Sequence, residues 1–118
     1  MVLWNRSKST HIASVYEIYR SWWKQARGLM FKTRQPDYAL IFKFDKEEKV
    51  PLHMFFVFYP IDVLFLDKNK KVVGMKPDFR PWHFHKPDCE AKYIIEAPEN
   101  TVAKAKIELG DAIDFFED

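Results

Sequence analysis

The apolar stretch at residues 52–67, LHMFFVFYPIDVLFLD, most constrains how this chain can fold. It is too short and carries too many polar groups to cross a bilayer, which takes about 20 mostly apolar residues. Its Phe, Val, Ile and Tyr side chains favour strands, and Pro60 belongs at a strand end, an edge or a bulge because it cannot donate to a sheet. We therefore predict two strands, 53–58 and 61–67, that meet at a kink and are covered by other layers.

Length and composition indicate a folded protein with one β-rich domain, residues 1–118. A hydrophobic content of 47% and an aromatic content of 17% exclude a disordered chain. The 19 basic and 17 acidic residues are spread along the chain, so we expect no nucleic-acid binding. Because Cys89 is alone and the first residues lack a signal-peptide pattern, we expect a cytoplasmic protein with no membrane association. Abundant Lys and Glu beside scarce Gln is a bias of hyperthermophile proteins.

The rest of the chain reads mainly as short strands separated by turns. Alternating apolar and polar residues, or β-branched and aromatic runs, predict strands at 2–5, 12–19, 38–44, 72–76, 92–97 and 112–116. Between them we expect a charged turn at 45–49, a hairpin turn at 67–71 and a long ordered loop at 77–89. Ser21 and Gly28 flank a short predicted helix, Trp22–Arg27. The fold class is therefore all-β, a barrel or jelly-roll-like sandwich with one or two short helical turns.

Several short motifs occur together in one order. RGLMF at 27–31 and ALIFKF at 39–44 precede His53-Met54 and PIDVLFLD at 60–67, and YIIE at 93–96 and Gly110-Asp111 follow. In these motifs the chain resembles the family called domain of unknown function 192, from about residue 12 onward. The resemblance implies a compact β-sandwich-like domain found in archaea and bacteria, with no established activity. Asn100 replaces the family's usual turn glycine and still permits a left-handed backbone.

Asp62 is the most informative polar residue. In an extended strand it shares a face with the leucines two and four residues further on, so it lies on an apolar stripe. A buried carboxylate without partners costs several kcal/mol. We expect a counter-charge from Lys76, Arg27 or Arg80, or hydrogen bonds from the backbone. The functional alternative is an Asp–Arg pair that lines a pocket.

The histidines raise the question of a metal site. His83 and His85 would share one face of an extended segment, and with His53 or Cys89 they could complete a tetrahedral zinc site. The alternative is that they pack and form hydrogen bonds. No second Cys or Glu stands at ligand spacing, so we predict neither a metal nor another cofactor.

Two hypotheses about function follow. The first is a non-enzymatic domain that binds a small ligand or a protein partner beside the 77–89 loop, where aromatic residues and histidines gather. The second is a small enzyme in which Arg27 orients an anionic substrate and Asp62 or a histidine handles a proton. We expect a monomer or a weak homodimer. The candidate pocket or binding residues are Arg27, Asp62, Lys76, Arg80, Trp82, His83, His85 and Glu96.

Overall fold

A five-stranded sheet forms the centre of the protein. The computed structural model describes residues 2–20, 37–53 and 59–117. The sheet has the order β3-β4-β9-β6-β7, and its neighbours are antiparallel except for the parallel pair β3 and β4. These strands are β3 (Val15–Tyr19), β4 (Tyr38–Glu48), β9 (Ala91–Pro98), β6 (Ile61–Leu66) and β7 (Val72–Phe79).

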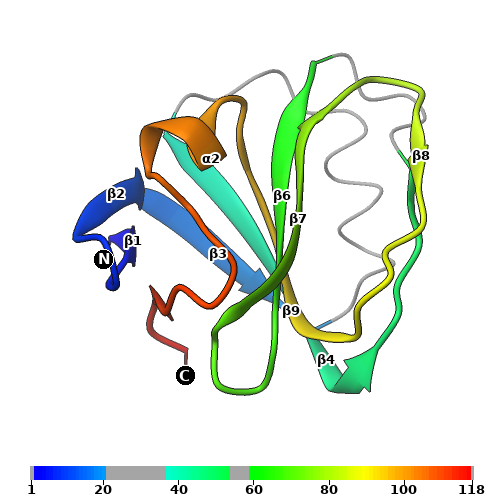
Figure 1. Ribbon diagram of the computed structural model, residues 1–118, viewed down its shortest axis with the longest axis horizontal. Coiled ribbons are helices and arrows are strands. Elements are labelled where there is room, and N and C mark those ends of the chain that lie inside the picture. Colours follow the sequence, from blue (N-terminus) through cyan, green and yellow to red (C-terminus); the bar gives the residue numbers. More distant parts are fainter. Residues whose placement is uncertain (1, 21–36, 54–58, 118) are drawn as a thin grey trace.

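Two smaller sheets lie on either side of the central strands (Figure 1). On one side, the helix α2 (Thr101–Lys104) lies near a sheet of β1 (Leu3–Asn5), β2 (Thr10–Ala13) and β10 (Ile113–Asp114). On the other side, β5 (Leu52–His53) pairs with β8 (Phe84–His85). The arrangement confirms the predicted all-β fold. It is sandwich-like and not a closed barrel.

Strand β6 is buried along its whole length. Ile61, Val63 and Phe65 face a core that includes Leu40 and Ile94. The alternate leucines of β6, at 64 and 66, face a second core built with the small sheet and the segment after α2. Both edges of β6 are also paired, to β7 and to β9. The predicted second strand of the 52–67 stretch and its alternation of faces are therefore confirmed.

The predicted strand at 12–19 is two strands, and they enter different sheets. The break falls at Ser14, between β2 and β3. The backbone N–H of Ser14 donates to Asp37 Oδ1 at 2.9 Å. β2 then pairs with β1, whereas β3 pairs in parallel with β4. The carboxylate of Asp37, which is distant in sequence, accepts this hydrogen bond at the break. The local pattern of residues at 12–19 therefore could not predict the break.

Two other predicted boundaries are wrong. The charged segment expected to be a turn at 45–49 continues β4 as far as Glu48, which pairs with Ala91 after a register shift. Lys92 Nζ supports this part of the strand by donating to the carbonyl of Asp45 at 2.7 Å. The predicted 77–89 loop begins inside β7 and contains β8. Cross-strand partners overrode the local signals in both places.

The predicted hairpin turn at 67–71 is present. In the 67–71 hairpin, Asp67 Oδ1 accepts hydrogen bonds from the backbone N–H groups of Asn69 and Lys71, at 2.8 and 3.0 Å. The left-handed residue of this turn is Lys70, with φ 62°. Asn100, which replaces the family's glycine, has φ 70°. The predicted helix at 22–27 and most of the predicted strand at 53–58 lie outside the described residues.

We expect Gly74→Ala to destabilise the protein by about 1–3 kcal/mol, a typical cost of overpacking. A Cβ atom at Gly74 would lie 2.6 Å from Cys89 Sγ, which is too close for unbonded atoms. Removing the sulfur should relieve the clash, so Cys89→Ala should rescue Gly74→Ala. Urea denaturation of the double-mutant cycle measures this coupling. Additive effects of the two substitutions would contradict it.

Candidate functional site

A turn between β7 and β8 presents two aromatic side chains to solvent. Trp82 is 51% exposed and Phe84 is 57% exposed. The N–H of His83 donates to the carbonyl of Arg80 at 3.2 Å, which closes the turn. Trp82 has φ 68°, a left-handed conformation that costs a bulky L-residue about 1–2 kcal/mol. We call residues 80–85 the aromatic turn.

The two histidine side chains of this turn have different surroundings. A ring nitrogen of His83, Nδ1, lies 3.1 Å from the carbonyl oxygen of Pro81, and the side chain is exposed. His85 packs inward, with its ring centroid 5.9 Å from that of Phe65 and 6.1 Å from that of Phe79. Burial, followed by the charge of Lys76, lowers the pKa of His85. Among the described residues, no group of three His, Cys, Asp or Glu side chains is placed to hold a metal ion.

Asp62 is buried and bound by the backbone. Only 2% of it is exposed. Its Oδ1 accepts a hydrogen bond from the N–H of Asp78 at 2.9 Å, and its Oδ2 accepts one from the N–H of Val102 at 2.8 Å. The carboxylate therefore ties β6 to an irregular part of β7 and to the first turn of α2.

Two of the three basic residues expected beside Asp62 are placed elsewhere. Lys76 lies opposite Val63 in the β6–β7 ladder. Arg80 Nε forms an exposed ion pair with Asp78 Oδ2 at 3.1 Å, a type of contact that contributes about 0–1 kcal/mol. Arg27 lies outside the described residues. Asp62 therefore contacts β7 through its hydrogen bond to the backbone of Asp78, two residues before the aromatic turn.

Glu96 is a second acidic residue in the central sheet, and its surroundings differ. It lies in β9 opposite Leu40 of β4 and Val63 of β6. Its Oε2 is buried and makes no hydrogen bond to any residue that the structure describes. Burial raises the pKa of Glu96 to about 8. The carboxyl of Glu96 therefore holds its proton at neutral pH, unlike an ordinary surface glutamate.

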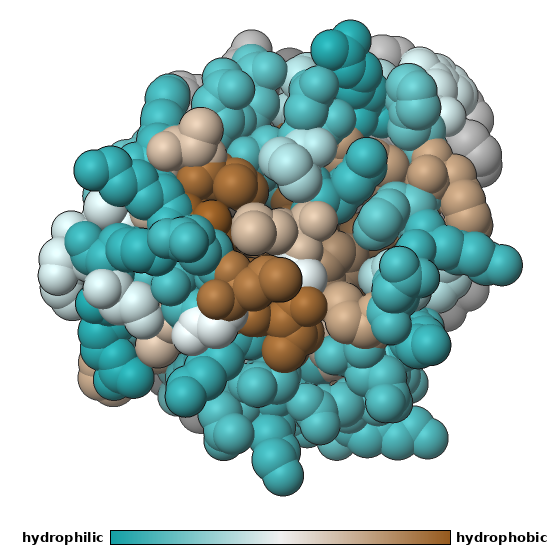
Figure 2. Space-filling model, viewed as in Figure 1, coloured by the Kyte–Doolittle hydropathy of each residue, from teal (hydrophilic) through white to brown (hydrophobic). Residues whose placement is uncertain are grey.

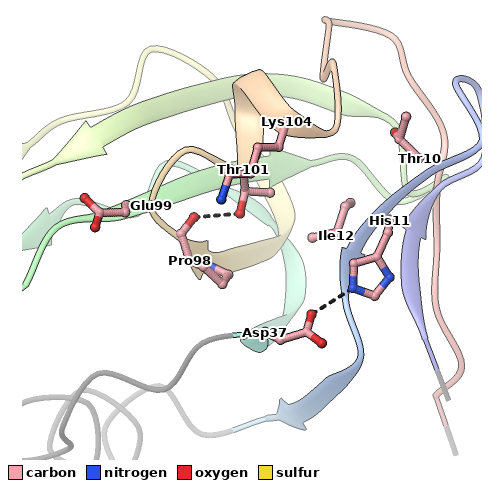
Figure 3. Close-up of a pocket in the computed structure, with 8 residues that line it drawn as sticks. All are labelled: Thr10, His11, Ile12, Asp37, Pro98, Glu99, Thr101 and Lys104. Carbon is pink, nitrogen blue, oxygen red and sulfur yellow. Dashed lines mark hydrogen bonds and ion pairs between the residues drawn. The ribbon is translucent and has the colours of Figure 1, made fainter.

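A pocket of about 440 Å³ lies between β2, the end of β9 and α2, and the aromatic turn contributes no residue to its lining (Figure 3). It was not predicted, because no motif connects the residues that line it. Two of its lining residues contact each other, because His11 Nε2 lies 2.7 Å from Asp37 Oδ1. The lining residues are Thr10, His11, Ile12, Asp37, Pro98, Glu99, Thr101 and Lys104.

Ser14, His11 and Asp37 have the composition of a catalytic triad but not its geometry. Hydrogen bonds from Ser14, and then from His11, lower the pKa of Asp37 to about 2, so this carboxylate is ionised. Ser14 Oγ lies 3.5 Å from the same ring nitrogen, Nε2, that contacts Asp37. In a catalytic triad, one ring nitrogen of the histidine accepts the proton of the serine, and the other ring nitrogen donates a hydrogen bond to the aspartate. This arrangement cannot pass a proton from Ser14 through the ring.

The fold and these sites define a small sandwich-like β-domain with an exposed aromatic turn. Within the described residues, no helix is long and apolar enough to cross a membrane. The chain belongs to the DUF192 family, whose model, described as "Uncharacterized ACR", matches residues 3–115. The resemblance drawn from the sequence motifs is thereby confirmed.

Curated relatives support this family placement, and a solved structure shares the fold. A UPF0127 protein of Thermococcus sibiricus is 39% identical over 97% of this chain and 74% of its own length. A UPF0127 protein of Pyrococcus horikoshii is 40% identical over 95% of this chain and 96% of its own. A crystal structure from Sinorhizobium meliloti, of a protein proposed to regulate transcription, has a TM-score of 0.82 at 22% identity and covers 96% of this chain and 89% of that one. The homologues include proteins of archaeal thermophiles, as the Lys and Glu bias suggested.

We expect Asp62→Ala to destabilise the protein by about 3 kcal/mol, because two partly buried backbone N–H groups lose their acceptor. The matched control is Asp78→Asn, which removes a charge from the exposed ion pair and suits the left-handed backbone there. The control should change the free energy of unfolding by less than about 0.5 kcal/mol. Urea denaturation measures both. Equal stability of Asp62→Ala and the wild type would contradict the structural role.

Glu96 should make the protein less stable as the pH rises. The unfolded chain has an ordinary glutamate pKa near 4.3, whereas the folded value is about 8. Between these values the folded state binds the extra proton, so the free energy of unfolding falls with rising pH. Glu96→Gln removes the titrating group. It should be more stable than the wild type at pH 8.5, by about 2–4 kcal/mol, and similar to it at pH 5.

The control for this comparison is Glu90→Gln, because Glu90 is an exposed glutamate just before β9. Its stability difference from the wild type should not change with pH. Chemical denaturation at the two pH values measures all three proteins. A stability difference between Glu96→Gln and the wild type that is the same at both values would rule out the raised pKa.

Proposed function

We propose that this protein is a non-enzymatic binding domain that docks another protein through the aromatic turn. The exposure of Trp82 and Phe84 carries the proposal. Tryptophan and other aromatic residues supply much of the binding energy at protein interfaces. The hydrogen bond that closes the turn and the left-handed backbone at Trp82 hold both side chains at the surface instead of in the core.

The form of this surface favours a protein over a small ligand. Small ligands bind mainly in concave sites, and the pocket in Figure 3 has no lining residue from the aromatic turn. In Figure 2, the side of the molecule where β8 lies in Figure 1 shows apolar side chains among strongly hydrophilic ones. An apolar centre within a polar rim is the usual anatomy of a protein–protein contact.

The charges around the turn indicate the kind of partner. Arg80 is paired with Asp78, so their charges offset one another. Lys86 and Asp88 offset one another as well, so the charges of residues 77–89 balance. We therefore propose a partner whose contact surface has an apolar centre and a rim with charges of both signs, because complementary charge guides association.

The observed sites support the other hypotheses less well. Asp62 is sealed by backbone hydrogen bonds, so it is poorly placed to handle a proton for a substrate held by Arg27. The likeness to the Sinorhizobium meliloti protein, at 22% identity, shows the fold alone. The balance of 19 basic and 17 acidic residues does not favour a nucleic-acid partner. A cytoplasmic location and a monomeric or weakly dimeric state stay predictions from the sequence.

Site-specific photo-crosslinking in cells tests the proposal. A photoreactive amino acid at position 82 or 84 should give a covalent adduct with a second protein. The same probe at Leu109 or Phe116, which are 65% and 73% exposed, should not. Mass spectrometry identifies the adduct. Equal adducts at the control positions, no adduct at all, or an adduct with only a second copy of this chain would overturn the proposal.

The identified partner then allows an affinity measurement. Trp82→Ala should weaken its binding by about tenfold or more, as truncation of an interface hot spot does. Leu109→Ala should change the affinity by less than about twofold. Circular dichroism of each variant checks that the fold is intact.

A further inference from the structure

The pocket in Figure 3 is large enough for a small organic molecule. Its volume is about 440 Å³, and ligand sites usually measure about 300–1,000 Å³. Ile12 of β2 and Pro98 at the end of β9 give it carbon surface. Figure 3 shows Lys104 of α2 on one side of the pocket and the His11–Asp37 pair on the other. Apolar surface with a few polar groups around it is the usual composition of a ligand site.

Lys104 contributes a positive charge to this pocket. Its side chain is exposed, and among the described residues it forms no ion pair. The ranges outside the description, 21–36 and 54–58, contain no Asp or Glu. Asp118 is then the one remaining acidic residue, and the glutamate before it is held by the hydroxyl of Tyr93 at 2.9 Å. The ammonium group can therefore pair with an anionic group of a ligand.

Two threonine hydroxyls in the lining act as hydrogen-bond acceptors. Thr10 Oγ1 donates its hydrogen to the carbonyl of Ala105 at 2.5 Å. Thr101 Oγ1 donates its hydrogen to the carbonyl of Pro98 at 2.6 Å (Figure 3). A hydroxyl has one hydrogen and two lone pairs, so each oxygen can only accept a further bond. A ligand that suits both oxygens carries its own O–H or N–H groups.

The opposite side of the pocket limits the charge of the ligand. Hydrogen bonds from Ser14 and then from His11 lower the pKa of Asp37 to about 2, so this carboxylate is ionised. It repels a second negative charge, which disfavours a multiply charged anion. It also already accepts from the N–H of Ser14 at 2.9 Å and lies 2.7 Å from His11 Nε2, so no ligand cation is needed there. A single negative charge with neutral hydroxyl donors fits these groups.

We propose that this pocket binds a small monocarboxylic acid that carries hydroxyl groups. The carboxylate of the ligand pairs with Lys104 Nζ, and its carbon chain packs on Ile12 and Pro98. Its hydroxyl groups donate to the side-chain oxygens of Thr10 and Thr101. The aromatic turn contributes no lining residue, so this site goes beyond the proposed function and stands or falls separately from it.

NMR titration of the ¹⁵N-labelled protein at pH 7 tests the proposal with six-carbon probes at equal ionic strength. Gluconate has a carboxylate and hydroxyl groups, hexanoate has only the carboxylate, and sorbitol has only the hydroxyl groups. Gluconate should shift the backbone amide resonances of Thr10, Ile12 and Thr101 saturably. It should bind at least about fivefold more tightly than either other probe, because each of them lacks one set of contacts.

Three results of the titration would overturn the proposal. The first is no saturable shift at these residues with gluconate. The second is hexanoate or sorbitol binding as tightly as gluconate, because one of the two groups would then play no part. The third is tighter binding of norleucine, a six-carbon amino acid, because the donor would then be an ammonium group.

A lysine substitution tests the charge. Lys104→Gln should weaken gluconate binding by about tenfold or more. Lys68→Gln is the matched control, because Lys68 is an exposed lysine in the 67–71 hairpin turn and does not line the pocket. It should leave the affinity unchanged, and so should Trp82→Ala. Unchanged affinity in Lys104→Gln would overturn the site. Weaker binding in Trp82→Ala would place the probe at the aromatic turn, so the proposal would fail while the proposed function stands.

Threonine substitutions test the hydroxyl contacts. Thr10→Val and Thr101→Val remove an acceptor and keep the shape of the side chain. Each should reduce the preference for gluconate over hexanoate by about threefold or more, whereas Thr10→Ser should keep it. This ratio of affinities is measured on folded protein, which circular dichroism checks, so a loss of stability does not change it. An unchanged preference in both valine variants would overturn the proposal.

Discussion

The whole structure depends on burying β6 on both faces and pairing it on both edges. Every one of its six residues is buried, and its neighbours β7 and β9 take up its backbone hydrogen bonds. A strand in this position forces two cores, one on each side of the central sheet. The small sheet and α2 complete one core, and β5 and β8 border the other. The outer elements therefore lie where they cover the two apolar faces of β6.

Asp62 in β6 and Glu96 in the neighbouring strand β9 are acidic residues with opposite surroundings. Asp62 receives two backbone N–H groups, so its charge is stabilised and serves to join β6, β7 and α2. One carboxyl oxygen of Glu96 has no hydrogen-bond partner in the described part of the chain, and burial raises the pKa of this carboxyl group to about 8. The first arrangement strengthens the fold, whereas the second weakens it above neutral pH. A residue that costs stability in this way is a better candidate for function than one that adds stability.

The functional candidates lie in separate parts of the molecule. The aromatic turn follows β7, the pocket of Figure 3 lies between β2 and α2, and Glu96 faces the core bordered by β5 and β8. The DUF192 family and its UPF0127 relatives carry no activity in their names. The chemistry of each site, and not the fold, therefore has to support any proposal about function.

The sequence by itself determined what depends on neighbours along the chain. The alternation in β6 and the Asp67 turn are local, so residue patterns were enough to predict them. Only the tertiary structure decided the break at Ser14, the continuation of β4 to Glu48 and the partners of Asp62. Each of these depends on atoms contributed from distant positions. Sequence periodicity reports which face a side chain occupies, but it contains no information about which distant atom will meet it there.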